Sequence, residues 1–199
     1  MCSSDLFLID SYVLALNNQP VRENEYDELL EKGKKSLSGW YDTYEDSFER
    51  NTLSEFRVNG VLLSPEIRLT GVLDKMEFID GDIVNVVDYK TGKPKTRNEL
   101  KGETKNSTGD YYRQLVFYKL LLKYFNEGRY NMQSGTIDFI EPDDTGKYRK
   151  EVFEIEDSEV GALEETINRV ADEILNLAFW DKKCDDKECE FCHLRDMMK

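Results

Sequence analysis

The feature that most constrains the fold is a pair of largely apolar segments, LTGVLDKMEF and IVNVVDYKTGK, which both carry ionisable side chains. Apolar residues on both faces of a segment are typical of strands that are covered from both sides. A charged side chain inside such a strand is costly unless it is paired or binds a metal ion. Asp88 and Lys90 lie two residues apart, so a strand projects both from the same face. The sequence therefore predicts a sheet with an ionic site in its central strands.

The pairing register of these two strands decides whether a third charged residue, Asp74, joins the pair. If Ile79 pairs with Ile83 across a three-residue turn, Asp74 lies directly opposite Asp88. A two-residue turn would instead direct Asp74 to the far face of the sheet. We expect the first register.

Two neighbouring carboxylates repel each other, so both stay ionised only with a cation between them. Oxygen ligands in a partly open site favour Mg²⁺ or Mn²⁺, and the backbone carbonyl of Tyr89 can supply a further oxygen. Such a cation activates a water molecule for attack on a phosphodiester, and Lys90 would position that water or neutralise the developing charge. The alternative is a structural ion pair of Asp88 and Lys90, with Asp74 an ordinary strand residue.

Periodicity predicts helices around these strands. The expected helices cover residues 7–17, 22–48 and 111–124, and a last one runs from Asp157 or Ser158 to Phe179 or Trp180. The expected strands cover residues 53–58, 61–63, 67–79, 83–91, 136–140 and 148–155. Asn59–Gly60 is expected to be a hairpin turn, and residues 92–109 a polar loop. The overall order of helices, three strands, helix, two strands and helix predicts an α/β fold, a central mixed sheet flanked by helices.

The composition suits one globular domain, with 39% hydrophobic and 12% aromatic residues in 199. No apolar run approaches the roughly 20 residues that cross a bilayer, and residues 1–16 lack the pattern of a secretory signal. We therefore expect no membrane association and a cytoplasmic location. The chain has no Walker-type phosphate-binding motif, so it is not a helicase motor.

The net charge of −14 is unfavourable for contact with phosphates, but the charge is unevenly distributed. Residues 88–105 carry six basic and three acidic side chains. Within this stretch we expect Lys93, Lys95 and Arg97 to contact DNA. The alternative is an ordinary solvated loop.

The segments GVLDK and VVDYKTGK resemble the PD-(D/E)XK nuclease superfamily. The closest branch is the RecB-like domain of UvrD-like and AddA/AddB helicase–nucleases and of Cas4 proteins. Where this family carries Q-x-x-x-Y in the following helix, the chain has Gln114 and Tyr118. The resemblance spans roughly residues 53–124 and implies a restriction-endonuclease-like core.

The resemblance also implies the site residues. Asp74 and Asp88 fall on the metal ligands and Lys90 on the catalytic lysine. The resemblance implies that Gln114 and Tyr118 are catalytic residues as well. Glu55 lies on an earlier strand, where relatives often carry a glutamate near the metal. Many relatives also have a metal-site histidine in an N-terminal helix, whereas the only histidine here is near the other end.

The function implied by the resemblance is a Mg²⁺- or Mn²⁺-dependent deoxyribonuclease, an exonuclease, in DNA repair and recombination. Its substrate would be DNA, single-stranded, supplied by helicase motor domains on the same polypeptide or on a partner subunit. Two alternatives stay open. One is a catalytically inactive DNA-binding module of a helicase, and the other is a stand-alone Cas4-like exonuclease.

Three of the four cysteines, Cys184, Cys189 and Cys192, crowd near the end of the chain, which is typical of a metal site rather than a disulfide framework. Iron–sulfur relatives carry an upstream cysteine and then C-x-x-C-x5-C, but Met198 stands at the last of these positions. His193 offers a fourth zinc ligand, although it would form a strained chelate with the adjacent cysteine. Zinc, an iron–sulfur cluster and free reduced thiols are the alternatives.

We expect four segments along the chain. Residues 1–6, MCSSDL, match the translation of a common sequencing adapter and are expected to be non-native. Residues 7–50 form the N-terminal helices, residues 51–180 the nuclease core, and residues 181–199 the cysteine-containing tail.

Overall fold

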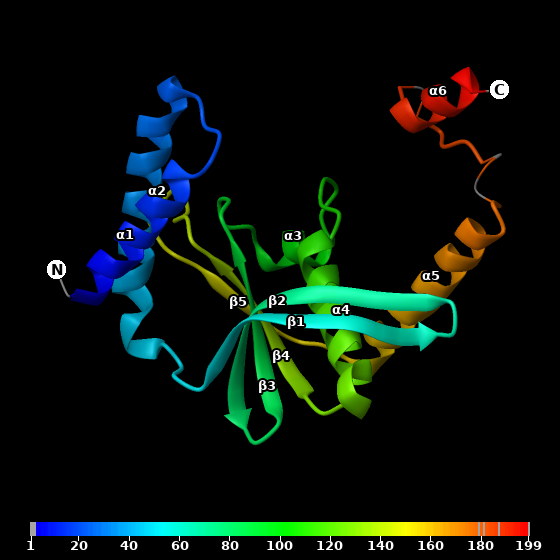
Figure 1. The fold of residues 1–199 in the computed structure, drawn as a ribbon, viewed down its shortest axis with the longest axis horizontal. Coiled ribbons are helices and arrows are strands. Elements are labelled where there is room, and N and C mark those ends of the chain that lie inside the picture. Colours follow the sequence, from blue (N-terminus) through cyan, green and yellow to red (C-terminus); the bar gives the residue numbers. More distant parts are fainter. Residues whose placement is uncertain (1–2, 179, 181, 187, 199) are drawn as a thin grey trace. The chain divides into compact units, whose positions relative to one another are not determined.

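The computed structural model of the protein describes residues 3–178, 180, 182–186 and 188–198. The chain divides into two compact units, Met1–Val160 and Gly161–Lys199. The first unit contains the sheet (Figure 1). No helix within the described ranges is long and apolar enough to cross a membrane.

The first unit is built on a sheet with the strand order β1-β2-β3-β4-β5. The strands are β1 (Thr52–Ser64), β2 (Ile67–Asp80), β3 (Ile83–Lys90), β4 (Asn131–Phe139) and β5 (Lys150–Glu154). The helices of the chain are α1 (Ser3–Asn17), α2 (Glu23–Tyr44), α3 (Arg97–Lys101), α4 (Asp110–Tyr124), α5 (Asp157–Leu175) and α6 (Glu190–Met197), with short 3₁₀ turns at Glu45–Ser47 and Phe125–Glu127. β3 and β4 run parallel, and the other neighbouring strands run antiparallel. This mixed five-stranded sheet flanked by helices confirms the predicted α/β fold of the restriction-endonuclease type.

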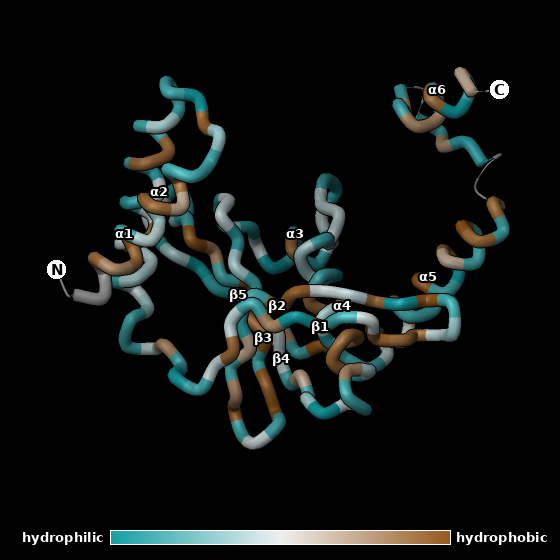
Figure 2. Tube along the Cα trace, viewed as in Figure 1, coloured by the Kyte–Doolittle hydropathy of each residue, from teal (hydrophilic) through white to brown (hydrophobic). Residues whose placement is uncertain are grey.

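Two parallel strands need a long crossover, and α3 and α4 provide it between β3 and β4. α4 lies against the sheet at close range because small residues face it. A Cβ atom on Gly71 would lie 2.5 Å from Leu121 Cδ1, and one on Gly135 would lie 3.0 Å from Leu115 Cδ1. Both leucines are fully buried, and Figure 2 shows the hydrophobic residues that run along the central strands. α4 is thus held directly over β3.

The predicted hairpin at Asn59–Gly60 is wrong. β1 continues through these residues, and its pairing with β2 shifts register between Val58 and Val61. Gly60 has a φ of 71°, a conformation that glycine adopts without strain, so the pair forms an irregularity within the strand instead of a turn. The chain reverses instead at Pro65–Glu66, between β1 and β2.

The predicted polar loop of residues 92–109 is also wrong in part, because it contains the short helix α3. Thr96 and Glu99 form a capping box at its start, in which each side chain binds the other residue's backbone amide. Leu100 anchors the helix and is 1% exposed. The last long helix, α5, ends at Leu175 rather than at the expected Phe179 or Trp180, and residue 179 lies outside the described residues.

Candidate active site

β2 and β3 pair in the first of the two registers considered for them. Lys75 lies opposite Val87, and this register places Asp74 across from Asp88. The expected three-residue turn is wrong, because Asp80 pairs with Ile83 and leaves only two residues between them. An irregularity after Phe78 shifts the pairing by one residue and restores the register at the site.

Asp74 lies where β2 parts from β3. The last ladder pair on this side is Lys75 with Val87. Beyond it, the backbone amide of Tyr89 donates a hydrogen bond to Asp74 Oδ2 at 2.9 Å. The carboxylate of Asp74 thus takes the place of a strand carbonyl, and this fixes the side chain next to Asp88.

Four predicted residues close a ring of polar contacts between β3 and α4. Lys90 Nζ donates to Gln114 Oε1 at 2.7 Å, and Gln114 Nε2 donates to the hydroxyl of Tyr118 at 2.6 Å. That hydroxyl donates to Asp88 Oδ1 at 3.0 Å. Asp88 Oδ2 completes the ring at 2.6 Å from Lys90 Nζ. Each donor meets an acceptor, so the ring orients all four side chains.

Asp88 is only 1% exposed. Burial raises its pKa above the ordinary aspartate value, and the negative charge of Asp74 acts in the same direction. The ammonium of Lys90 and the hydroxyl of Tyr118 lower the pKa of Asp88. Burial and the charge of Asp88 raise the pKa of Tyr118, which therefore remains a protonated donor. The carboxylate is held in the interior by two specific partners.

The donor set fits a divalent cation. Asp88 Oδ2 is a buried oxygen that accepts no hydrogen bond of good geometry among the described residues, although the ammonium of Lys90 lies within ion-pair distance. Asp74 brings a second carboxylate from the neighbouring strand. Hard oxygen ligands with unused acceptor capacity suit Mg²⁺ or Mn²⁺.

Tyr111 is a site residue that the sequence did not single out. The ammonium groups of Lys90 and Lys95 both lie 4.5 Å from the centre of its ring. Tyr111 precedes Gln114 by three residues on α4, and this shared helical face was the available signal. The ring links the buried ion pair to the basic stretch after β3.

The other predicted DNA contacts are engaged within the protein. Exposed Lys93 pairs with Asp144 at 2.6 Å. Arg97 donates to the carbonyl of Val152 at 2.8 Å, and its guanidinium lies 4.2 Å from the ring of Phe153. Arg97 therefore holds α3 against β5. Contact of Lys93 or Arg97 with DNA stays a prediction.

Glu55, the further predicted ligand, is exposed and lies on β1. The ladder of β1 and β2 runs in one register on both sides of it, which places Glu55 across from Asp74. Its φ of 52° is a strained conformation for a residue with a side chain. Its role as a ligand stays a prediction.

The opposite face of the sheet carries a second buried carboxylate, which the sequence did not reveal. Asp138 is fully buried and accepts a hydrogen bond from the indole of Trp40 at 2.8 Å. Lys150 Nζ lies 2.8 Å from its other oxygen. The hydrogen bond from Trp40 ties α2 to the sheet, and the ion pair joins β4 to β5.

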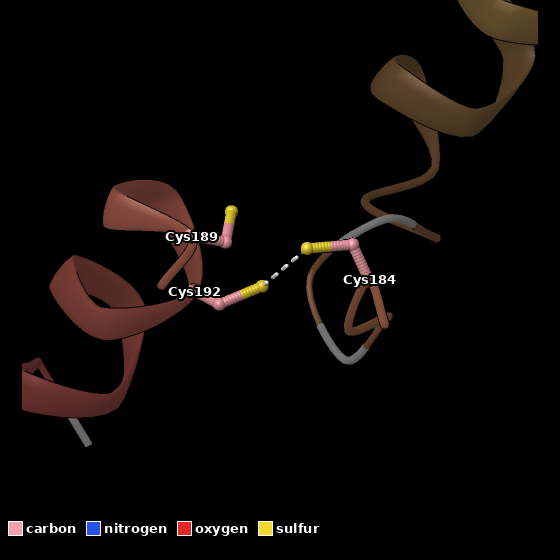
Figure 3. A group of neighbouring side chains, drawn as sticks. All are labelled: Cys184, Cys189 and Cys192. Carbon is pink, nitrogen blue, oxygen red and sulfur yellow. Dashed lines mark hydrogen bonds between the residues drawn. The ribbon is translucent and has the colours of Figure 1, made fainter. Parts of the chain in front are cut away.

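The three predicted cysteines come together near the end of the second unit (Figure 3). Their Sγ atoms lie within 4.8 Å of one another. Cys184 Sγ and Cys192 Sγ are 3.6 Å apart, so they are in contact but are not a disulfide. Hydrogen bonds that the Cys184 thiol donates, first of all to Cys189, raise the pKa of Cys184 to about 11.

Comparisons with known proteins bear on what this arrangement is. No curated protein matches the sequence. A crystal structure of the protein SSO0001 is similar, with a TM-score of 0.40 and 13% identity over 90% of this chain and 88% of that one. The sequence model of the PD-(D/E)XK nuclease superfamily matches residues 11–197, which include every residue of the polar ring. The chain belongs to the PD-(D/E)XK nuclease superfamily.

Proposed function

We propose that this chain is the RecB-like nuclease domain of a helicase–nuclease that acts in DNA repair and recombination. It hydrolyses DNA phosphodiester bonds with Mg²⁺ or Mn²⁺, as an exonuclease on single strands that a helicase motor supplies. The observation that supports this most is the ring of Asp88, Lys90, Gln114 and Tyr118 beside Asp74. A purely structural ion pair needs no second carboxylate against it, because two like charges destabilise a buried site.

Asp74 and Asp88 would hold the metal, with the backbone carbonyl of Tyr89 and the carboxylate of Glu55 as further oxygen ligands. When bound, a divalent cation supplies the Lewis acidity that activates water and stabilises charge on the scissile phosphate. Lys90 then donates a hydrogen bond to the attacking water or to a phosphate oxygen.

Gln114 and Tyr118 act on the reaction through other residues. The amide oxygen of Gln114 fixes the ammonium of Lys90, and the hydroxyl of Tyr118 fixes the carboxylate of Asp88. Both side chains lie on α4, which the glycines of β2 and β4 hold close to the sheet. The helix therefore sets the distance between metal ligand and lysine.

The DNA strand would approach along the basic stretch that follows β3. Lys93 and Lys95 lie there at the surface, and Lys95 contacts the ring of Tyr111 beside the ion pair. The overall charge of −14 makes this stretch a small cationic area on an acidic protein. Such a surface supports delivery of the strand by a neighbouring domain rather than tight independent binding.

The test is cleavage of end-labelled single-stranded DNA with Mg²⁺, Mn²⁺ or chelator, by wild type, Asp88→Asn and Lys90→Met. We expect metal-dependent cleavage by the wild type and losses of at least about 100-fold in both variants. Asp138→Asn is the matched control, because it removes an equally buried carboxylate with its own lysine partner from the other face of the sheet. Its activity per folded molecule should be retained.

The same assay separates the alternatives. Metal-dependent cleavage that is equal in the wild type and both site variants contradicts the assignment of the site. If the proteins bind the labelled strand and none of them cleaves it, the chain is the catalytically inactive module. The single histidine, His193, favours this hypothesis because it lies in the second unit and not in an N-terminal helix, where many relatives carry a metal-site histidine. A stand-alone Cas4-like exonuclease would in addition require a four-cysteine iron–sulfur cluster.

A further inference from the structure

The cysteine-containing tail has almost no hydrophobic interior. Among its described residues, 180, 182–186 and 188–198, only Arg195 is buried. Large apolar side chains of α6 are exposed instead, including Phe191 at 84% and Met197 at 77%. Segments this small and this exposed are not ordered by burial of apolar surface, and they need a disulfide or a metal ion.

The tail nevertheless has a defined architecture. Arg195 Nη1 donates to the carbonyl of Trp180 at 3.1 Å and also to the carbonyl of Lys182. Lys183 Nζ lies 2.6 Å from Asp196 Oδ2. These contacts hold Trp180, Lys182 and Lys183, which precede Cys184, against α6.

Cys189 and Cys192 present their thiols at the start of α6. Cys189 is the N-cap of the helix, and Cys192 lies in its first turn. The Cys189 side chain forms no capping hydrogen bond, but the nearby backbone amides of Cys192 and Phe191 lower the pKa of its thiol. The N-terminus of a helix favours a negatively charged ligand atom, so a thiolate at this place is stabilised. Cys184 faces both thiols from the preceding segment (Figure 3).

We propose that Cys184, Cys189 and Cys192 bind a zinc ion that orders the tail, with water as the fourth ligand. Zinc–thiolate bonds of about 2.3 Å in tetrahedral geometry place neighbouring sulfurs about 3.8 Å apart. The observed separation of Cys184 Sγ and Cys192 Sγ is 3.6 Å, and the third sulfur lies within 4.8 Å. The spacing of the three sulfurs is thus close to that of three corners of a tetrahedron around one ion.

The same geometry disfavours the other occupants. A disulfide needs a sulfur–sulfur distance of about 2.05 Å. An iron–sulfur cluster is held by four cysteines and places several atoms between their sulfurs. The described residues provide three thiols in mutual contact. Soft thiolate ligands also select zinc over the Mg²⁺ or Mn²⁺ of the carboxylate site.

The experiment measures the metal content of the full chain, purified under reducing conditions, and its spectrum after exchange with Co²⁺. We expect one zinc per chain and, with Co²⁺, a thiolate-to-cobalt charge-transfer band. Zinc binding should weaken by more than about 100-fold in each of Cys184→Ser, Cys189→Ser and Cys192→Ser. Loss of a residue that only hydrogen-bonds to a metal ligand costs about 10–100-fold, and loss of the ligand itself should cost more. Cys2→Ser and His193→Ala are the controls and should retain the zinc.

Removal of zinc should raise backbone amide exchange in residues 182–198 and leave exchange in the sheet unchanged, because the ion orders only the tail. This readout is independent of nuclease activity. A protein that contains no zinc and gives no cobalt–thiolate band overturns the proposal. So does iron with acid-labile sulfide, a disulfide in the purified protein, or loss of zinc in Cys2→Ser or His193→Ala.

Discussion

Replacement of Tyr118 by Phe tests the polar ring at its most buried contact. The change removes the hydroxyl that donates to Asp88 Oδ1 at 3.0 Å and accepts from Gln114 Nε2 at 2.6 Å. The ring of the side chain still fills the same space, so no cavity forms. The loss is therefore confined to hydrogen bonds around a carboxylate that is 1% exposed.

The expected cost follows from that burial. A hydrogen bond to a charged group contributes about 1.5–3 kcal/mol, and a buried acceptor that loses its donor cannot turn to water. We expect Tyr118→Phe to lower the free energy of unfolding by about 2–3 kcal/mol. The matched control is Tyr112→Phe on the same helix, whose hydroxyl donates to Glu159 at 2.7 Å. Glu159 is only half-buried and can be rehydrated, so that change should cost about 1 kcal/mol.

Urea unfolding in the presence of chelator measures both values, with the slope expected to be unchanged. DNA cleavage should fall in Tyr118→Phe and not in Tyr112→Phe, because only Tyr118 holds a metal ligand. Equal destabilisation by the two variants, or a cost for Tyr118→Phe below about 0.5 kcal/mol, would show that Asp88 does not depend on this donor.

Asp88, Trp40 and Gly71 offer three more tests. Because burial raises the pKa of Asp88, its stabilising contribution is full below the ordinary aspartate pKa and is lost as pH rises through the raised value. In chelator, the unfolding free energy of wild type minus that of Asp88→Asn should therefore fall as the pH rises above the ordinary aspartate pKa, and a flat difference contradicts this. Trp40→Phe removes the indole donor of buried Asp138 and should cost about 2 kcal/mol in thermal or urea unfolding, whereas a neutral effect means that the α2 contact is not formed. Gly71→Ala places a methyl group 2.5 Å from Leu121 Cδ1 and should cost about 1–3 kcal/mol by the same measurement, whereas stabilisation would show that α4 does not lie close to β2.

The central hairpin is the most predictable part of the molecule. Charged residues inside apolar strands are costly, so Asp74, Asp88 and Lys90 stand out in the sequence itself. Gln114 and Tyr118 follow from the motif and from their spacing on one helical face. The structure brings these five side chains together, and their chemical roles remain proposals.

The features that the sequence did not reveal depend on distant partners or on subtle local geometry. Asp138 meets Trp40 across 98 residues of sequence, and no local period signals such a pair. Asn59–Gly60 has the composition of a hairpin turn, but β2 offers pairing partners on both sides of it, so the strand continues. The capping box of α3 was visible as Thr96 and Glu99, although the surrounding polar residues suggested a loop.

The proposed metal site can be tested without any substrate by a Mn²⁺ titration followed by electron paramagnetic resonance. The titration compares wild type, Asp74→Asn and Asp88→Asn with the control Asp138→Asn. We expect one bound Mn²⁺ in the wild type and in the control, and loss of that ion in both site variants, because two carboxylates on neighbouring strands hold it together. Equal binding by all four proteins, or no binding by any, would mean that these two carboxylates do not form a metal site.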